Sequence, residues 1–351
     1  MLLGHHIQQD RLLFCLYSDE EQTSHFFRQV EMAAKVTLVT GCSTGIGLSI
    51  AARLARDPAK GYLVYASMRN LKKKDELLEA AGDSLNKTLF LQELDVKNLD
   101  SVKGAVKRVI ADQGRIDALV NNAGIAGFNA LEYMEYDEIQ DIMDTNFMGS
   151  LRMMKEIVPH MKKRRAGRII NVSSIVGLMA YPFYEIYTAS KHAIEGLNDA
   201  LASRLYEFDI RTTSLILGPV TTMINENIKD LGRLPSKEHI DDVTNRQLKL
   251  LSKYQKYQFE DGVAQSPEEM ALYVQECLET DDPPLWTMTS KFSNDRVGYR
   301  YADPTGMKWV HRQRRLVEPP GFDIDELRRQ AVAAALEQKR QERRRNNDVP
   351  K

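Results

Sequence analysis

A tyrosine and a lysine one helical turn apart can carry out proton transfer together, and the chain has such a pair at Tyr187 and Lys191. Residues at positions i and i+4 lie on one face of a helix. Tyrosine has an ordinary pKa of about 10 and a nearby ammonium stabilises its phenolate, so we expect Lys191 to lower the pKa of Tyr187. Tyr187 would then act as a general acid/base toward an alcohol or carbonyl oxygen. Because such a pair is also common on helix surfaces, this interpretation needs support from other parts of the chain.

Two further polar residues can complete a catalytic group with this pair. Ser174 comes just after the apolar run Arg168–Val172, and its hydroxyl can hold the substrate oxygen beside Tyr187 while hydride moves to or from carbon. Asn146, in a predicted helix, can position a water between Lys191 and solvent, although taken alone it would be interpreted as an ordinary polar residue of a helix interior. We therefore predict that Tyr187, Lys191, Ser174 and Asn146 are catalytic, and that Ser174 and Tyr187 also bind substrate.

A glycine-rich turn, Thr40–Gly47, stands between a buried-strand pattern and a helix pattern. Glycines let the backbone approach a pyrophosphate closely, and the helix N-terminus supplies unpaired N–H groups and a positive dipole end. A glycine-rich turn alone is weak support, but its place between strand and helix makes it a phosphate-binding turn. The predicted cofactor contacts in this turn are Gly41, Ser43, Thr44, Gly45, Ile46 and Gly47.

The end of the second candidate strand, Tyr65–Asn70, indicates which dinucleotide binds. An acidic residue at this point binds the 2′-hydroxyl of NAD, whereas a cation accommodates the 2′-phosphate of NADP. No carboxylate follows the strand, while Arg69 offers a fork of donors suited to phosphate, with help from Ser43. We therefore predict NADP(H); the alternative is that Arg69 is an unpaired surface residue.

Other candidate cofactor contacts also lie at predicted carboxyl ends of strands, where an open α/β sheet binds its ligand. Asp95 can accept a hydrogen bond from the adenine amino group. In Asn122–Gly124, small residues let the backbone lie against the cofactor, so we include Asn122, Ala123 and Gly124. Lys191 is also expected to hold the nicotinamide ribose hydroxyls.

Apolar, β-rich runs that alternate with helical stretches must position these residues. The candidate strands are Val36–Thr40, Leu63–Ala66, Thr88–Leu94, Ala118–Val120, Arg168–Val172 and Arg211–Leu217. Most are continuous apolar runs, a pattern typical of a parallel sheet with helices on both faces. The sequence thus predicts an α/β fold with a Rossmann-like, doubly wound parallel sheet.

Three regions flank or interrupt this pattern. Residues 1–31 show no clear period and form an N-terminal extension, whether as a poorly ordered arm or upstream of a true start at Met32. Residues 221–265 are helical and polar and are expected to cover a substrate cleft, before a helix capped by Ser266. Residues 319–351 form a charged C-terminal helix or tail beyond the main domain at 32–318.

Composition narrows the function classes. The chain has 351 residues, 43% hydrophobic and 28% charged, with a formal net charge of -1. This balance is typical of a soluble globular protein and argues against nucleic acid as a partner. Cys15, Cys42 and Cys277 match neither a disulfide framework nor a metal site, so we expect a reducing, cytoplasmic location and no metal. No apolar run is long enough for a transmembrane helix or a signal peptide.

Together these motifs resemble the short-chain dehydrogenase/reductase family. The motifs that carry the resemblance are Thr40–Gly47, Asn121–Gly124, Asn146, Ser174 and Tyr187 with Lys191. The resemblance covers about residues 35–310. It implies a single Rossmann-like domain, hydride transfer with a nicotinamide cofactor, and association into dimers or tetramers, of which we expect a homodimer.

More narrowly, Ala66–Arg69, Gly177–Met179, Tyr187–Leu197 and Gly218–Val220 are similar to the group that includes retinol dehydrogenase 8 and 17β-hydroxysteroid dehydrogenase type 1. That likeness implies large, apolar alcohols and ketones as substrates. It also places four residues along the substrate pocket and the nicotinamide, namely Leu178, Met179, Pro219 and Val220. The alternative for each of them is a residue of the ordinary hydrophobic core.

One departure from this group concerns the residues that hold the phenolic end of an oestrogen. The oestrogenic enzyme uses a His and a Glu, where this chain has Arg246 and either Ser290 or Lys291, so we do not expect that recognition to be kept. Two alternatives stay open, a reductase of another lipophilic carbonyl and a non-catalytic NADP(H)-binding protein. An amphipathic face at 222–258 also leaves peripheral membrane contact open.

Overall fold

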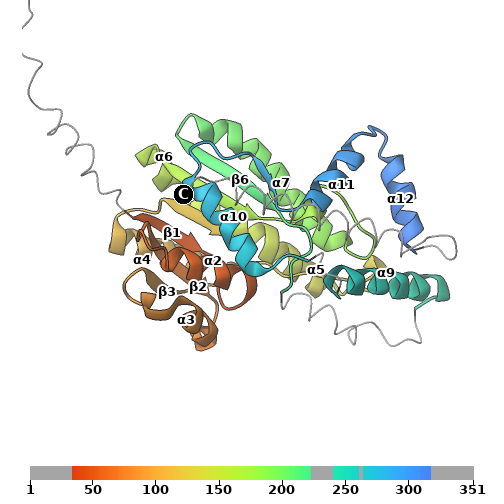
Figure 1. Ribbon diagram of the computed structural model, residues 1–351, viewed down its shortest axis with the longest axis horizontal. Helices are drawn as coiled ribbons and strands as arrows, with labels where there is room; N and C mark the ends of the chain where they lie inside the picture. Colours follow the sequence, from red (N-terminus) through yellow and green to blue (C-terminus); the bar gives the residue numbers. More distant parts are fainter. Residues whose placement is uncertain (1–33, 223–239, 261–263, 318–351) are drawn as a thin grey trace, which may run out of the picture. The chain divides into compact units, whose positions relative to one another are not determined.

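The computed structural model describes residues 34–222, 240–260 and 264–317 (Figure 1). The chain divides into two units, Met1–Ala34 and Lys35–Lys351, and all the described helices and strands belong to the second. The predicted N-terminal extension and C-terminal tail lie outside the described residues. So do 223–239 and 261–263 of the predicted substrate cover.

The described part of the second unit contains one seven-stranded sheet, and every strand pairs with its neighbours in parallel. The strand order is β3-β2-β1-β4-β5-β6-β7. The strands are β1 (Lys35–Val39), β2 (Tyr62–Met68), β3 (Leu89–Glu93), β4 (Ala118–Asn121), β5 (Gly167–Val172), β6 (Ile210–Ile216) and β7 (Trp286–Met288). The predicted Rossmann-like doubly wound fold is confirmed. All six candidate strands are present within two residues of their expected ends, while β7 was not expected.

Helices cover both faces of this sheet, as Figure 1 shows. The longer ones are α2 (Gly45–Ala55), α4 (Leu99–Gln113), α6 (Gly149–Arg164), α7 (Glu185–Tyr206), α9 (Asp242–Glu260), α10 (Pro267–Glu279), α11 (Lys291–Tyr301) and α12 (Met307–Val317). Shorter segments are α3 (Asp75–Ala81), α5 (Tyr136–Met143), η1 (Leu71–Lys73), η2 (Gly82–Ser84), η3 (Leu131–Tyr133), η4 (Asp144–Met148) and η5 (Ile175–Gly177). Apolar residues of α2 and α10 form one core with the sheet, and those of α4, α6 and α7 form another. The strands are buried between these layers, which explains their continuous apolar runs.

Local sequence signals account for several helix ends. Ser266 and Glu269 form a capping box at the start of α10, where Pro267 occupies the first helical position, as the sequence predicts. Asn98 caps α4 through a bond from the Ser101 N–H, and Gly114 ends that helix with a φ of +72°. These caps fix where the helices meet the loops of the site.

In the parallel sheet, the carboxyl ends of all the strands lie at one edge. Arg69 directly follows β2 and Asn122 directly follows β4, while Asp95 lies two residues after the end of β3.

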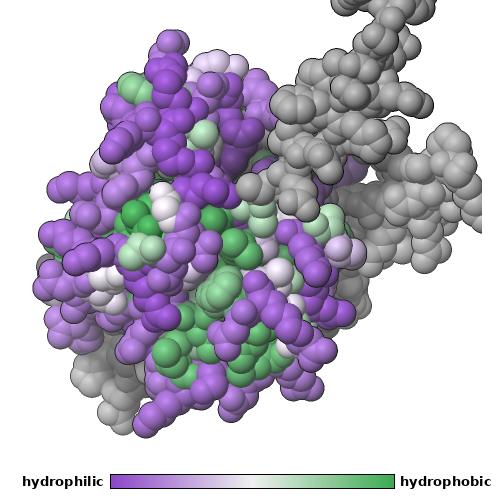
Figure 2. All heavy atoms as spheres, turned by 90° about the vertical axis from the view of Figure 1, so that its left-hand side faces the viewer, coloured by the Kyte–Doolittle hydropathy of each residue, from purple (hydrophilic) through white to green (hydrophobic). Residues whose placement is uncertain are grey.

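The helices α9, α11 and α12 lie together on the right of Figure 1, away from β2 and β3. The face seen from the left is largely hydrophilic, with a group of hydrophobic residues at its lower centre (Figure 2). In the described ranges, no helix is both long and apolar enough to cross a bilayer.

Candidate active site

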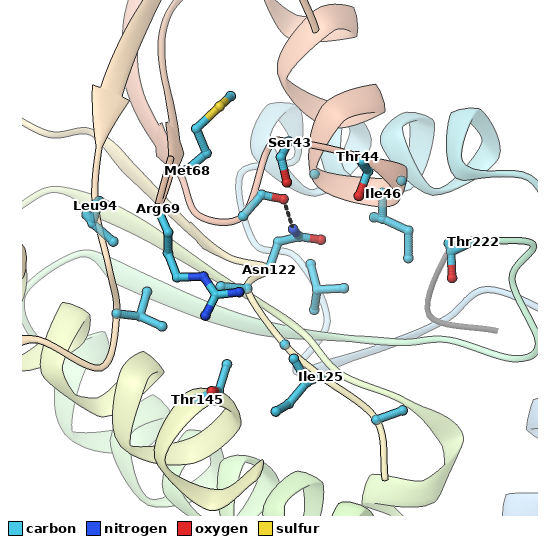
Figure 3. A pocket seen from close by; sticks show the side chains of 18 of the residues that line it. Ser43, Thr44, Ile46, Met68, Arg69, Leu94, Asn122, Ile125, Thr145 and Thr222 are labelled. Carbon is cyan, nitrogen blue, oxygen red and sulfur yellow. Dashed lines mark hydrogen bonds between the residues drawn. The ribbon is translucent and has the colours of Figure 1, made fainter. Parts of the chain in front are cut away.

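A cavity of about 520 Å³ opens at this edge of the sheet (Figure 3). Thirteen of the predicted site residues line it: Gly41, Ser43, Thr44, Gly45, Ile46, Gly47, Arg69, Asp95, Asn122, Ala123, Gly124, Tyr187 and Lys191. The phosphate-binding turn and the Tyr–Lys pair, far apart in sequence, therefore face one space.

The glycine-rich turn is held in a conformation that favours glycine. Gly41 and Gly45 have φ values of +73° and +61°. A Cβ on Gly47 would collide with the Gly41 carbonyl oxygen and with the Asn122 side chain, which donates to the Thr40 and Gly41 carbonyls at 2.8 and 3.1 Å. Figure 3 shows this amide beneath the turn. Thr44, the N-cap of α2, makes no side-chain cap bond, so the first-turn N–H groups are open to an anion.

Cations gather at the other side of the turn. Figure 3 shows Arg69 extending from the end of β2 into the pocket. Its side chain is exposed and has no hydrogen bond or ion pair within the described residues. Lys73 and Lys97 also line the cavity, but Lys97 is paired with Asp141 at 2.6 Å. Asp95 accepts a bond from the Lys97 backbone N–H at 3.0 Å, which fixes its carboxylate in a turn.

Ser174, Tyr187 and Lys191 come together at the ends of β5 and α7. Burial raises the pKa of Tyr187 to about 12, and hydrogen bonding with Ser174 opposes this shift. Burial lowers the pKa of Lys191 to about 8, and Glu195 opposes this shift. The Lys191 Nζ lies 5.8 Å from the centroid of the Tyr187 ring and donates to the Val172 carbonyl at 2.9 Å. The expected lowering of the Tyr187 pKa is therefore wrong for the chain by itself, because burial outweighs the opposing hydrogen bond with Ser174.

Asn146 lies in η4, a π-helical turn between α5 and α6, rather than in a regular α-helix. Its amide group accepts from the Ile125 N–H at 2.8 Å and donates to the Ile125 carbonyl and the Ser190 hydroxyl, both at 2.9 Å. A Cβ on Gly124 would lie 3.3 Å from Asn146 Oδ1 and 3.8 Å from Lys191 Nζ. Asn146 thus ties the segment after β4 to α7, close to Lys191.

Some predicted site residues do not line this cavity. Leu178 and Met179 are buried in an apolar cluster that also contains Trp309 and contacts Tyr187. Val220 is buried in the main core, and the Pro219 carbonyl accepts from the Gln265 N–H at 2.9 Å. Ser174 and Asn146 adjoin the cavity through their contacts and do not line it.

Sequence reasoning missed other residues that line the cavity. Most of them neighbour the predicted motifs: Met68, Leu94, Val96, Lys97, Ile125, Ala126, Thr145, Val172 and Ser173. Extending each motif by one or two positions would have found them. Lys73, Leu217 and Thr222 complete the set, and of these Lys73 carries a signal, as one of three consecutive lysines soon after Arg69.

The residues present fit a nicotinamide dinucleotide. Open N–H groups at the start of α2 suit a pyrophosphate, and Gly124 keeps the chain narrow where a Cβ would lie only 3.3 Å from Asn146 Oδ1. Arg69 supplies an exposed guanidinium at one end, and Tyr187 supplies a proton donor at the other. In the described part of the chain, no group of three or more His, Cys, Asp or Glu side chains is arranged to hold a metal ion.

The fold and this site define an oxidoreductase that acts on alcohol and carbonyl groups. The chain belongs to the short-chain dehydrogenase family, whose sequence profile matches residues 35–231. Retinol dehydrogenase 8 of Bos taurus is 35% identical over 278 residues, covering 79% of this chain and 88% of that protein. 17-beta-hydroxysteroid dehydrogenase type 1 of Homo sapiens is 36% identical over 292 residues, covering 80% and 86%. The predicted family and group are confirmed.

A solved structure is also similar, that of an alcohol dehydrogenase from the archaeon Thermococcus sibiricus complexed with 5-hydroxy-NADP. It has a TM-score of 0.58 and 26% sequence identity, and the match covers 73% of this chain and 95% of that one.

Proposed function

We propose that the protein is an NADP(H)-dependent oxidoreductase that interconverts an apolar alcohol and its carbonyl, either retinol and retinal or a 17β-hydroxysteroid and its 17-ketosteroid. The observation that carries this proposal is that Tyr187 and Lys191 line the same cavity as the glycine-rich turn and Arg69. A proton donor and a dinucleotide-binding surface thus meet where a carbonyl carbon could receive hydride.

The bound cofactor would supply or accept the hydride at the substrate carbon. In the direction of reduction, Tyr187 donates its phenolic proton to the carbonyl oxygen, and Ser174 holds that oxygen by a hydrogen bond. Lys191 stabilises the phenolate that remains, and in oxidation the same groups act in reverse. Asn146 keeps Ser190 and the Ile125 backbone in place beside Lys191.

Arg69 supports the choice of NADP(H) over NAD(H). Its guanidinium is exposed at the cavity and can form paired, charge-assisted hydrogen bonds to a phosphate. Lys73, which is also exposed and lines the same cavity, adds positive charge. The Thermococcus relative was solved with an NADP derivative, which agrees with this choice.

The apolar cluster next to Tyr187 supports a lipophilic substrate. It contains Ile175, Val176, Leu178, Met179, Ile216, Val297 and Trp309, with Tyr181 partly buried against it. The names of the relatives, retinol dehydrogenase 8 and 17-beta-hydroxysteroid dehydrogenase type 1, point to substrates of this class. Arg246 is exposed on α9 and Ser290 caps α11, which agrees with the expectation that the His and Glu recognition of a phenolic end is not kept.

The test is NADPH consumption by the purified full-length protein, with all-trans-retinal and oestrone compared side by side, each with NADPH and NADH. Turnover of retinal with a preference for NADPH is the expected result. If neither compound is reduced, the retinoid and steroid proposal fails and another lipophilic carbonyl becomes the substrate. If NADH is preferred, the assignment of Arg69 fails.

A further inference from the structure

Few charged side chains are buried in the part of the chain that the structure describes. Among the described residues, only Lys191, Glu195 and Asp303 are charged and less than a tenth exposed, at 7%, 4% and 9%. The Asp303 carboxylate is satisfied by backbone N–H groups of Thr305 and Lys308, at 3.0 and 2.8 Å. Lys191 donates to the Val172 carbonyl at 2.9 Å, so Glu195, four residues further along α7, is the buried charge without such a local explanation.

The two side chains occupy adjacent turns on the face of α7 that packs against the β5–η5 loop and β6. A Cβ on Gly177 would lie 3.1 Å from Glu195 Cγ, 2.9 Å from the Ser173 hydroxyl and 3.3 Å from the Lys191 carbonyl. This close packing fixes the Glu195 side chain beneath Ser173, which itself lines the cavity. Within the described chain, neither Glu195 carboxyl oxygen has a well-directed hydrogen bond.

A buried carboxylate lowers the stability of a protein unless an opposite charge or hydrogen bonds compensate for the lost water. The pKa of Glu195 is raised, chiefly by burial and to a smaller extent by the exposed Asp199. The Ser173 and Ser214 hydroxyls and the charge of Lys191 oppose this shift. Glu195 is also the charged group that raises the pKa of Lys191 against the lowering by burial. Each charge therefore favours ionisation of the other.

We propose that Glu195 is a positioning residue of the catalytic group, the buried counter-charge that keeps Lys191 in its ammonium form beneath the cavity. Glu195 does not face the substrate and acts on Tyr187 only through Lys191. Its role in turnover rests on the function proposed above, whereas its effect on Lys191 is a property of the chain alone. A purely structural residue at this position would need no charge.

The direct experiment measures the pKa of Lys191 by titrating lysine 13Cε resonances in the full-length protein, with Lys191 assigned by its loss in Lys191→Arg. Glu195→Gln keeps the side-chain shape and removes the charge. We expect the Lys191 pKa to fall by about one unit or more, because the opposite charge buried one helical turn away on α7 is lost. Glu207→Gln, the same change at the exposed C-cap of α7, should leave it unchanged. An unchanged Lys191 pKa in folded Glu195→Gln overturns the proposal.

Ser214→Ala provides a second test if Glu195→Gln does not fold. It removes a hydroxyl that favours the Glu195 carboxylate and lies outside the residues lining the cavity. The Lys191 pKa should fall in this variant by less than in Glu195→Gln, and an unchanged value contradicts the proposal.

The pH profile of reduction separates this inference from the proposed function. If Glu195→Gln lowers both the Lys191 pKa and the pH above which the rate of reduction falls, the inference on Glu195 and the proposed function are both supported. If the Lys191 pKa shifts while the parent protein reduces neither retinal nor oestrone, the inference on Glu195 stands and the proposed substrates fail. A uniform loss of rate at every pH, with the Lys191 pKa unchanged, indicates a structural role only and overturns the inference.

Discussion

Arg69 is the single side chain on which the proposed preference for NADPH depends. It stands exposed at the cavity, so its replacement should alter phosphate binding without disturbing the core. We expect Arg69→Ala to raise the KM for NADPH by roughly 10- to 100-fold, the effect of losing one or two charge-assisted hydrogen bonds, with little change for NADH. Steady-state kinetics with both cofactors measure this change.

Arg108→Ala is the matched control for that measurement. Arg108 is exposed on α4, its one ion pair among the described residues is with Asp112 at 3.7 Å, and it does not line the cavity. Its removal should alter neither KM. If Arg69→Ala raised the KM for NADPH and for NADH by the same factor, the guanidinium would not bind the 2′-phosphate.

Lys191 gives the reaction a defined pH dependence. Its pKa is lowered to about 8, so Lys191 is an ammonium below that pH and loses its charge as the pH rises through it. Carbonyl reduction needs that charge to stabilise the Tyr187 phenolate, so the rate at saturating NADPH should fall above about pH 8.

Lys191→Arg tests the assignment of this alkaline limb. Arginine stays charged throughout the range, so whatever activity remains should persist above about pH 8, even if its maximum is lower. An alkaline limb at the same pH in parent and variant would show that another group titrates.

Residue types and spacing predict much of the site but not its electrostatics. The i, i+4 spacing of Tyr187 and Lys191 places both at one cavity, as the sequence indicates. The pKa shift of Tyr187 has the opposite direction because burial, which depends on packing and is not visible in the sequence, is its largest cause. Glu195 looks like an ordinary polar helix residue until its 4% exposure is known.

The π-helical turn η4 is the element that connects the segment after β4 with α7. Asn146→Ala would remove three hydrogen bonds, leaving the half-buried Ile125 N–H, the Ile125 carbonyl and the Ser190 hydroxyl with fewer partners. We expect the free energy of unfolding to fall by about 2–4 kcal/mol, together with a loss of turnover. Urea denaturation followed by fluorescence measures the first effect.

Asn294→Ala is the corresponding control on an exposed position of α11. It should change stability by less than about 0.5 kcal/mol. If Asn146→Ala were as stable as the parent, η4 would not depend on this amide.

The structure also shows which elements sequence patterns could predict. Buried parallel strands give continuous apolar runs, so β1 to β6 were found with small errors at their ends. The strand β7 has three residues, all half-buried, too short to show any period. The path of the loop after β6 also depends on packing, which is why Leu217 and Thr222 line the cavity where Pro219 and Val220 were expected.

At the scale of the whole molecule, the second unit contains every described strand and every residue of the site. The sheet begins with β1 at Lys35, and the cavity begins with Gly41. We propose that residues 32–318 form the catalytic domain, so a chain starting at Met32 should keep the Tm and the turnover of the full chain. Thermal unfolding and NADPH consumption measure both, and a loss of either would show that residues 1–31 contribute to the domain.

Topology explains why so many site residues could be predicted together. The carboxyl ends of parallel strands meet at one edge, so motifs that follow β1, β2, β3, β4 and β5 must converge there. The apolar cluster around Leu178 and Met179 includes Val297 and Trp309 from α11 and α12, far along the chain. No local pattern indicates such contacts, which is why the substrate side was the least predictable part.

The central claim is that Tyr187 transfers the proton in a cavity that also binds the cofactor, and Tyr187→Phe tests it most directly. NADPH binding, followed by cofactor fluorescence, should stay within about twofold of the parent, while kcat for carbonyl reduction falls by roughly 100- to 10,000-fold. Tyr136→Phe, at a position 87% exposed, should match the parent in both measurements. If Tyr187→Phe binds NADPH and turns over at the rate of the parent, Tyr187 is not the general acid/base.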